Sequence, residues 1–146
     1  MGVNANRPLS PHLGIYRRSP AMMMSIIRRA TGFIMATAGM LTLLWWLSAI
    51  GSGTEGFATF HRYVISAGKD ATIFGVVANW FFRLLGFAVL YSFFQHMFSG
   101  LRHLVMDMGA GFELTTNRTW TWVAYIAAFF ATALVILLVV WHSIGA

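Results

Sequence analysis

Three long stretches of apolar residues, separated by short polar segments, dominate the sequence. The first, Ala30–Ile50, carries no charged residue and covers about 21 residues, or roughly 31 Å of helix, which matches the hydrocarbon core of a bilayer. The second lies between Arg83 and Arg102, which stand about 28 Å apart along a helix, so both side chains can reach opposite interfaces. The third runs over Thr119–Trp141. The pattern predicts an all-α integral membrane protein with three spans arranged up, down, up.

The polar segments set the predicted domain boundaries. Residues 1–21 form a polar arm in which Pro8 and Pro11 disfavour a helix. The rest, residues 22–146, forms the membrane domain, with spans at about 22–50, 73–105 and 119–142. Between the first two spans, residues 54–71 leave room for a short surface helix. A glycine-containing loop over 107–118 joins the last two.

Composition supports a membrane protein over a soluble one. The chain has 146 residues, of which 58% are hydrophobic and 10% charged, against roughly 25% charged in soluble domains. A chain this short has too little interior to hide that much apolar surface. The net charge of +6 does not indicate nucleic-acid binding, because the basic residues lie outside the apolar runs or at their ends. The absence of cysteine excludes thiolate ligation of an iron–sulfur cluster by this chain.

The basic residues also predict an orientation. Seven fall on the side of the N-terminal arm and the second connection, and three on the other. The first group is Arg7, Arg17, Arg18, Arg28, Arg29, Arg102 and Arg118, and the second is Arg62, Lys69 and Arg83. By the positive-inside rule the N-terminus faces the cytoplasm and the C-terminus lies outside.

His96 is the most informative polar residue within a predicted span. It lies about 9 Å inside Arg102, and ionisable groups at such depth mark functional sites by default. Gly100, His103 and Asp107 fall within roughly 40° of it on the helix. A haem whose iron binds His96, with Gly100 leaving room for a flat ligand, suits this stripe. Ordinary helix packing, with Gly100 at a close contact and His96 bonded to a neighbour, suits it too.

A second polar cluster stands where the first span begins. Ser25 lies three residues before Arg28 and four before Arg29, so its side chain is adjacent to both on a helix. One hydroxyl and two guanidinium groups at interfacial depth can bind a lipid headgroup, an acidic partner, a haem propionate or a quinone carbonyl. Plain positive-inside anchoring explains them equally well.

Three stretches together resemble one family. They read Arg7-Pro-Leu-Ser-Pro-His-Leu-Gly-Ile-Tyr16, Ser25-Ile-Ile-Arg-Arg-Ala-Thr-Gly32 and His96-Met-Phe-Ser-Gly-Leu-Arg-His-Leu-Val-Met-Asp107. In this order and spacing they resemble the cytochrome b membrane-anchor subunit of succinate dehydrogenase, the larger of the two anchors of succinate:ubiquinone oxidoreductase. The resemblance covers nearly the whole chain and is closest to the mitochondrial and proteobacterial branch, in which two small anchors share one haem b.

The resemblance implies a role for each motif. His96 would be a haem axial ligand holding the iron, with the second ligand supplied by the partner anchor. Ser25 and Arg29 would line the ubiquinone pocket, and His103 and Asp107 would face the iron–sulfur subunit. Arg28, Arg102 and His103 become candidate contacts of the haem propionates. The family commonly has histidine at the position of Arg28; arginine pairs well with a propionate but cannot switch protonation near neutral pH.

The resemblance further implies a place in respiratory complex II. Partner flavoprotein and iron–sulfur subunits would oxidise succinate, and this non-flavin subunit would anchor them in membrane lipid. The complex would link the tricarboxylic acid cycle to electron transport. The expected location is a bacterial inner membrane, with a mitochondrial inner membrane as the alternative. Three other functions stay open: a haem-free anchor, the anchor of a quinol:fumarate reductase, and a small transporter or channel subunit.

Overall fold

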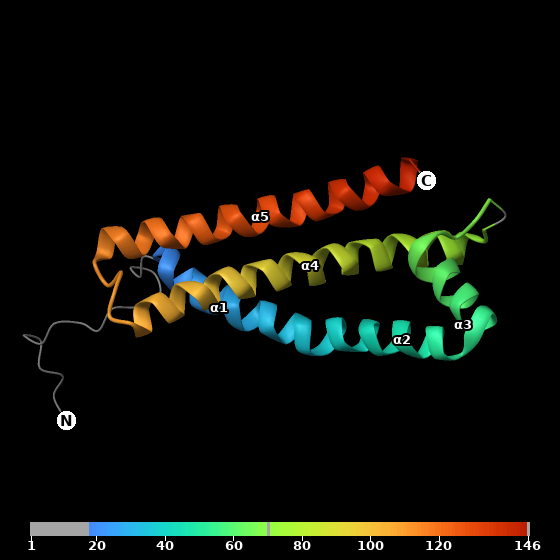
Figure 1. Cartoon of the computed structure of the whole chain (residues 1–146), viewed down its shortest axis with the longest axis horizontal. Helices are drawn as coiled ribbons and strands as arrows, with labels where there is room; N and C mark the ends of the chain where they lie inside the picture. The colour runs from blue at the N-terminus through green and yellow to red at the C-terminus, as the bar shows by residue number, and fades with distance from the viewer. Residues whose placement is uncertain (1–17, 70, 146) are drawn as a thin grey trace, which may run out of the picture.

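The structure, a computed structural model, describes residues 18–69 and 71–145, and the side chains of these residues as far as His142. Within that part of the chain every regular element is helical (Figure 1). The first motif of the resemblance, Arg7–Tyr16, lies outside the described residues. The helical elements confirm the all-α class predicted from the sequence. They form three long rods that are apolar enough to cross a membrane: Pro20–Gly51, Ile73–Asp107 and Leu114–His142.

The first rod is made of three consecutive helical segments. These are α1 (Pro20–Ile34), a π-helical turn η1 (Met35–Gly39) and α2 (Met40–Gly51). The Ser19 side chain accepts a hydrogen bond from the Met22 amide at 3.4 Å, and Pro20 occupies the first turn, where its missing N–H is not needed. This cap starts the helix two residues before the predicted Met22.

The other two rods are α4 (Ile73–Asp107) and α5 (Leu114–Gly145). Thr72 caps α4 by accepting from the Gly75 amide at 3.2 Å. Helix α5 begins five residues before the predicted start of the third span at Thr119. Thr119 and Thr121 donate to carbonyls one turn back, at 3.1 and 2.8 Å. The connection between the rods is correspondingly short, and Gly109 and Gly111 adopt φ values of 87° and 79° in it.

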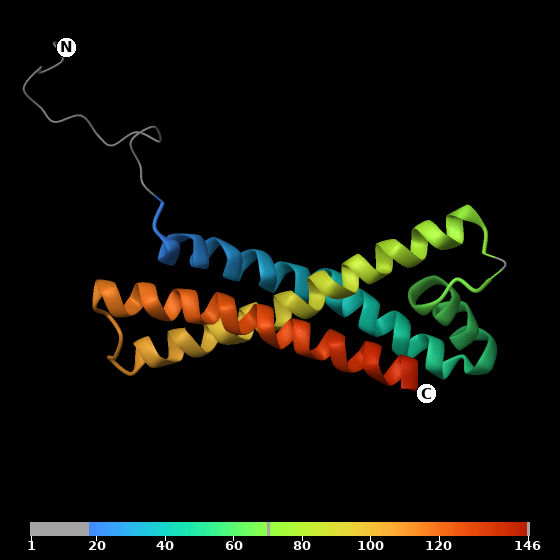
Figure 2. The same ribbon diagram turned by 90° about the horizontal axis from the view of Figure 1, so that it is seen from above.

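The rods lie side by side and alternate in direction. Helix α4 packs against both α1 and α5, so the start of α1, the end of α4 and the start of α5 meet at one end of the bundle (Figures 1 and 2). A Cβ atom added at Gly39 would lie 3.3 Å from a methyl group of Val89. Small residues at such contacts let two backbones approach closely in a membrane.

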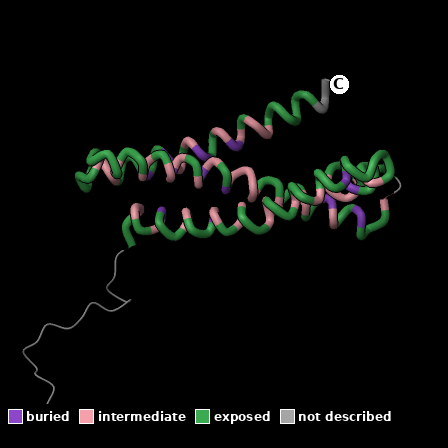
Figure 3. The backbone as a smooth tube through the Cα atoms, turned by 60° about the horizontal axis from the view of Figure 1, so that its bottom comes forward, coloured by how far each residue is buried: buried purple, intermediate pink, exposed green. Residues whose placement is uncertain are grey.

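The distribution of burial is that of a membrane protein. Among the described residues the buried apolar side chains are small in number, and buried polar ones outnumber them: Thr31, Asn79, Ser92, Gln95, Ser99, Thr121 and Thr132 against Met24, Ala49, Phe60, Ala124 and Ala128. Large apolar side chains point outward along all three rods, so that buried positions form only short patches on the facing sides (Figure 3). Lipid, rather than protein, covers most of the apolar surface.

At the opposite end, a surface helix packs against the start of α4. It comprises α3 (Gly53–Phe60) and the π-helical turn η2 (His61–Ile65). Two side chains of α4 donate to its last carbonyls: Asn79 to Tyr63 at 3.4 Å and Arg83 to Ile65 at 3.2 Å. Trp45, at the far end of the first rod, packs edge-on against Phe60 at 5.1 Å between ring centroids.

Replacing Asn79 should loosen this end without unfolding the bundle. Asn79→Leu leaves the Tyr63 carbonyl without its donor, a loss of about 1–3 kcal/mol if the group stays buried. We expect faster amide hydrogen exchange over residues 61–66, measured on the purified protein, and unchanged exchange in the middle of α4 and α5. The control Thr59→Val removes a hydroxyl that bonds only within its own helix and should leave exchange as it was. Unchanged exchange in Asn79→Leu would contradict the role given to this side chain.

Candidate haem and quinone site

His96 is held against the backbone of α1. Its ring is half-buried, and its Nδ1 lies 3.2 Å from the carbonyl oxygen of Arg28. A carbonyl oxygen can only accept, so this hydrogen bond places the ring proton on Nδ1 and leaves the lone pair on Nε2. A neutral imidazole in that tautomer is ready to ligate a metal through Nε2.

Gly32 provides the surface on which this ring rests. A Cβ atom at Gly32 would lie 3.1 Å from Cε1 of His96 and 3.4 Å from its Nδ1. A Cβ atom at Gly100, by contrast, would meet no atom of the described residues within 4 Å. The glycine that lets His96 approach its neighbour is therefore on α1, one turn beyond Arg28, and not Gly100 on the same helix. Sequence analysis placed Gly32 in a family motif but gave it no role.

The Arg28 carbonyl is also tied to its own helix. The hydroxyl of Thr31, which is buried, lies 3.0 Å from this oxygen and 2.9 Å from the carbonyl oxygen of Ile27. The acceptor that orients His96 thus belongs to a backbone turn braced by a buried side chain. Such braced acceptors fix both the tautomer and the orientation of a ligating imidazole.

Ser25 and Arg29 lie at the edge of the face of α1 that carries Arg28 and Gly32, since each is within about 60° of Gly32 in helical projection. Both are exposed in this chain, whereas the Arg28 side chain between them is half-buried. They are one helical turn, about 6 Å, apart. The structure therefore brings Ser25 and Arg29 together, as their spacing predicts, on a surface that the other helices of this chain leave open.

His103 and Asp107 continue the face of α4 that carries His96. Each is within about 20° of His96 in helical projection, His103 half-buried and Asp107 exposed at the last residue of the helix. Arg28, Arg102 and Asp107 are the charged groups that interact with His103. The predicted stripe from His96 to the end of α4 is thus present, and its outer part lies beside the start of α1.

Arg102 is directed elsewhere. It lies about 120° around α4 from His96, and one of its terminal nitrogens donates a short hydrogen bond to the side-chain oxygen of Asn117 on α5. The structure thus joins Arg102 to α5, and it gives no contact between Arg102 and His96. A contact between Arg102 and a haem propionate stays a prediction.

Gln95, next to His96, is a buried residue that sequence analysis did not single out. Its side chain is fully buried, and its amide nitrogen lies 3.2 Å from the sulfur of Met24. Its Oε1 has no hydrogen-bond partner among the described residues. A glutamine in an apolar span was a signal that could have marked the α1–α4 contact, because buried amides face protein rather than lipid.

Comparison with known proteins decides the family. A model of the succinate dehydrogenase/fumarate reductase transmembrane subunit matches residues 3–143. This chain is a member of that family.

Individual members agree with this assignment. The succinate dehydrogenase cytochrome b556 subunit of Paracoccus denitrificans is 38% identical over 113 residues, which are 75% of this chain and 73% of the relative. The cytochrome b560 subunits of Reclinomonas americana and Marchantia polymorpha are 32% and 33% identical over 114 residues each, covering 78% of this chain and 73% and 77% of the relatives. The similarity predicted from the three motifs is confirmed.

The donor set of this transmembrane subunit fits one side of a haem. A porphyrin brings its own four nitrogen ligands, so each axial position needs only one side chain, and a neutral imidazole with a free Nε2 is a common choice. His96 meets that requirement through the bond from Nδ1 to Arg28. The other described histidines, at 61, 103 and 142, lie near the ends of the helices.

Filling the space beside His96 should disturb haem binding. Gly32→Val places a branched side chain where even one Cβ atom would be 3.1 Å from the ring, so the imidazole must turn or the helices must separate. We expect a shifted or weakened reduced b-type absorption in the purified complex. The control Gly86→Val, at a glycine with no atom within 4 Å of an added Cβ, should keep the normal spectrum. A normal spectrum in Gly32→Val would mean that His96 does not need this space.

Proposed function

We propose that this chain is the membrane-anchor cytochrome b subunit of a succinate:ubiquinone oxidoreductase. One observation carries the proposal: an imidazole within a span is oriented by a main-chain acceptor so that Nε2 is available, in a chain that belongs to the succinate dehydrogenase/fumarate reductase family. The relatives described above are all named as succinate dehydrogenase subunits, which favours succinate oxidation over fumarate reduction.

His96 is the residue that would hold haem b, as one of two axial ligands, with the other from a second small anchor subunit. When bound, haem b supplies a one-electron redox centre within the membrane. Arg28 and His103 are the candidates for its propionates, because they lie beside the face that carries His96. The guanidinium of Arg28 is suited to pair with the carboxylate of a propionate.

Ser25 and Arg29 would bind ubiquinone. Reduction of a quinone places negative charge on its carbonyl oxygens, and a nearby guanidinium stabilises that charge, more strongly in a site of low dielectric constant. The hydroxyl of Ser25, one helical turn from Arg29, can donate a hydrogen bond to a carbonyl oxygen of the quinone. Because both residues are exposed in this chain, the remaining wall of the pocket must come from other subunits.

The partners follow from the chemistry that this chain lacks. It has no cysteine, so electrons must reach the quinone from an iron–sulfur subunit, which in turn is supplied by a flavoprotein subunit. We assign His103 and Asp107 to the contact with the iron–sulfur subunit. In this proposal the N-terminus and the α4–α5 connection face the cytoplasm, and the membrane is the inner membrane of a bacterium.

Loss of the imidazole at position 96 should remove the axial ligand. In His96→Ala the purified complex should lose its reduced-minus-oxidised b-type absorption or show it strongly shifted. The matched control is His142→Ala, a histidine exposed near the far end of α5, which should leave the spectrum intact. An unchanged spectrum in His96→Ala would assign the iron to another residue. Absence of a b-type spectrum from the unmodified complex would support a haem-free anchor.

Loss of the guanidinium at position 29 should separate the two half-reactions. In Arg29→Leu, succinate:ubiquinone reductase activity should fall by roughly 10²-fold, the usual effect of removing one group that stabilises developing charge. Succinate oxidation by an artificial acceptor should persist, because it does not use the quinone pocket. Arg118→Leu, which removes another exposed arginine, serves as the control. Equal loss of both activities in Arg29→Leu would indicate failed assembly instead of a quinone contact.

A further inference from the structure

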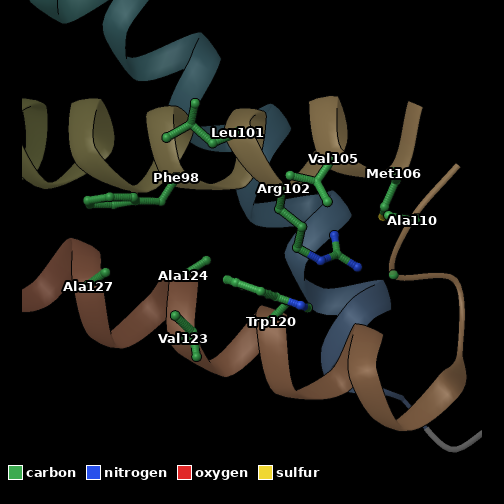
Figure 4. A pocket seen from close by; sticks show the side chains of 11 residues that line it. Phe98, Leu101, Arg102, Val105, Met106, Ala110, Trp120, Val123, Ala124 and Ala127 are labelled. Atoms are coloured by element: carbon green, nitrogen blue, oxygen red, sulfur yellow. The ribbon is translucent and has the colours of Figure 1, made fainter. Parts of the chain in front are cut away.

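An apolar slot opens between α4 and α5, on the side of α4 away from His96. Its volume is about 270 Å³, and its walls are mainly the side chains of Phe98, Leu101 and Val105 from α4 and of Trp120 and Val123 from α5 (Figure 4). Most of these side chains are exposed in this chain. The slot is therefore open toward the surroundings of the helices and accepts an apolar group.

One charged residue, Arg102, lies in this apolar slot. Figure 4 shows its guanidinium group reaching from α4 into the space between the helices, toward the end where α5 begins. A terminal nitrogen donates to Asn117, but Nε is buried and has no hydrogen-bond partner among the described residues. No carboxylate of the described residues forms an ion pair with it. A half-buried cation in an apolar site needs an anion to offset its lost hydration.

The depth of Arg102 points to the source of that anion. Arg102 is five residues before the end of α4 at Asp107, about 7.5 Å along the helix, which is the depth of the headgroup region. Trp120, exposed on α5, lies across the slot, and tryptophan is typical of this layer of a membrane. An anion at this depth with an apolar chain beside it describes an anionic phospholipid.

We propose that the slot binds one acyl chain of an anionic phospholipid whose phosphate pairs with Arg102. The slot's volume of about 270 Å³ lies just below the roughly 300–1,000 Å³ of pockets that enclose a drug-sized ligand. It therefore suits part of a single acyl chain and is too small for a porphyrin. The 120° between Arg102 and His96 separates this site from the proposed haem site. The lipid site does not depend on the proposed redox function.

Lipid binding to the purified complex tests the site directly. The delipidated complex is titrated with phosphatidylglycerol and, separately, with phosphatidylcholine, and bound lipid is counted by native mass spectrometry. We expect one phosphatidylglycerol site to weaken about tenfold in Arg102→Gln and in Ala127→Phe, which fills the slot from α5 but keeps the guanidinium. The controls Arg83→Gln, at the other end of α4, and Ala36→Phe, at an exposed position of η1, should bind as the unmodified complex does.

Four results would overturn the proposal. Equal phosphatidylglycerol binding in all variants would show that the slot is not a lipid site, and equal weakening for phosphatidylcholine would show that net anionic charge is not recognised. If Arg102→Gln alters the b-type spectrum and leaves lipid binding intact, the guanidinium serves a propionate.

A single cysteine introduced at Val123, in a chain that otherwise has none, should react with a lipid-soluble maleimide; protection by a partner subunit would assign the slot to a protein contact.

Discussion

The contact between the His96 ring and the backbone of α1 is the constraint on which the arrangement of the other groups depends. It needs α1 and α4 to lie close enough for an imidazole to reach a main-chain carbonyl, and glycine at position 32 makes room for the ring, since a Cβ atom there would lie 3.1 Å from it. Once the ring is seated there, α4 has a fixed rotation: His103 and Asp107 follow on the same face, and Arg102 turns toward α5. Beside that contact, α1 leaves Ser25 and Arg29 exposed to whatever surrounds the bundle.

Lipid solvation explains why the interior is polar. In water, burial of leucine and phenylalanine would drive the helices together, but in a bilayer those side chains gain nothing by leaving the lipid. The buried positions go instead to serine, threonine and glutamine, whose polar atoms are more costly to expose to hydrocarbon. Most hydroxyls bond a carbonyl of their own helix, as Thr121 and Thr132 do. The rods are held mainly by close contacts between small groups and by a few inter-helix bonds.

The fold class and the family were predictable because they depend on local properties: run length, charge position and motif spacing. The spacing of His96, His103 and Asp107 also predicted that they share one face. The role of Gly32 and the partner of Arg102 were not predictable, since both depend on how α4 is rotated against its neighbours. Apolar residues occur on every side of α4, so apart from the buried polar Ser92, Gln95 and Ser99 the sequence carries little sign of that rotation. The prediction placed the start of the third span at Thr119 from the apolar run, whereas helix α5 continues back through the polar residues Asn117 and Arg118 to Leu114.

The acceptor for His96 is a peptide carbonyl, and every amino acid carries one. The position whose main chain orients the ring can therefore carry another side chain without loss of this bond, and arginine at position 28 supplies the acceptor as any other residue would. Position 32 has less freedom, since a Cβ atom there would lie 3.1 Å from the ring and the imidazole would have to shift to make room for it. Two positions one turn apart on α1 thus contribute to the ring's seat in different ways: the first supplies its carbonyl whatever side chain it carries, and the second holds the ring closest when it carries none.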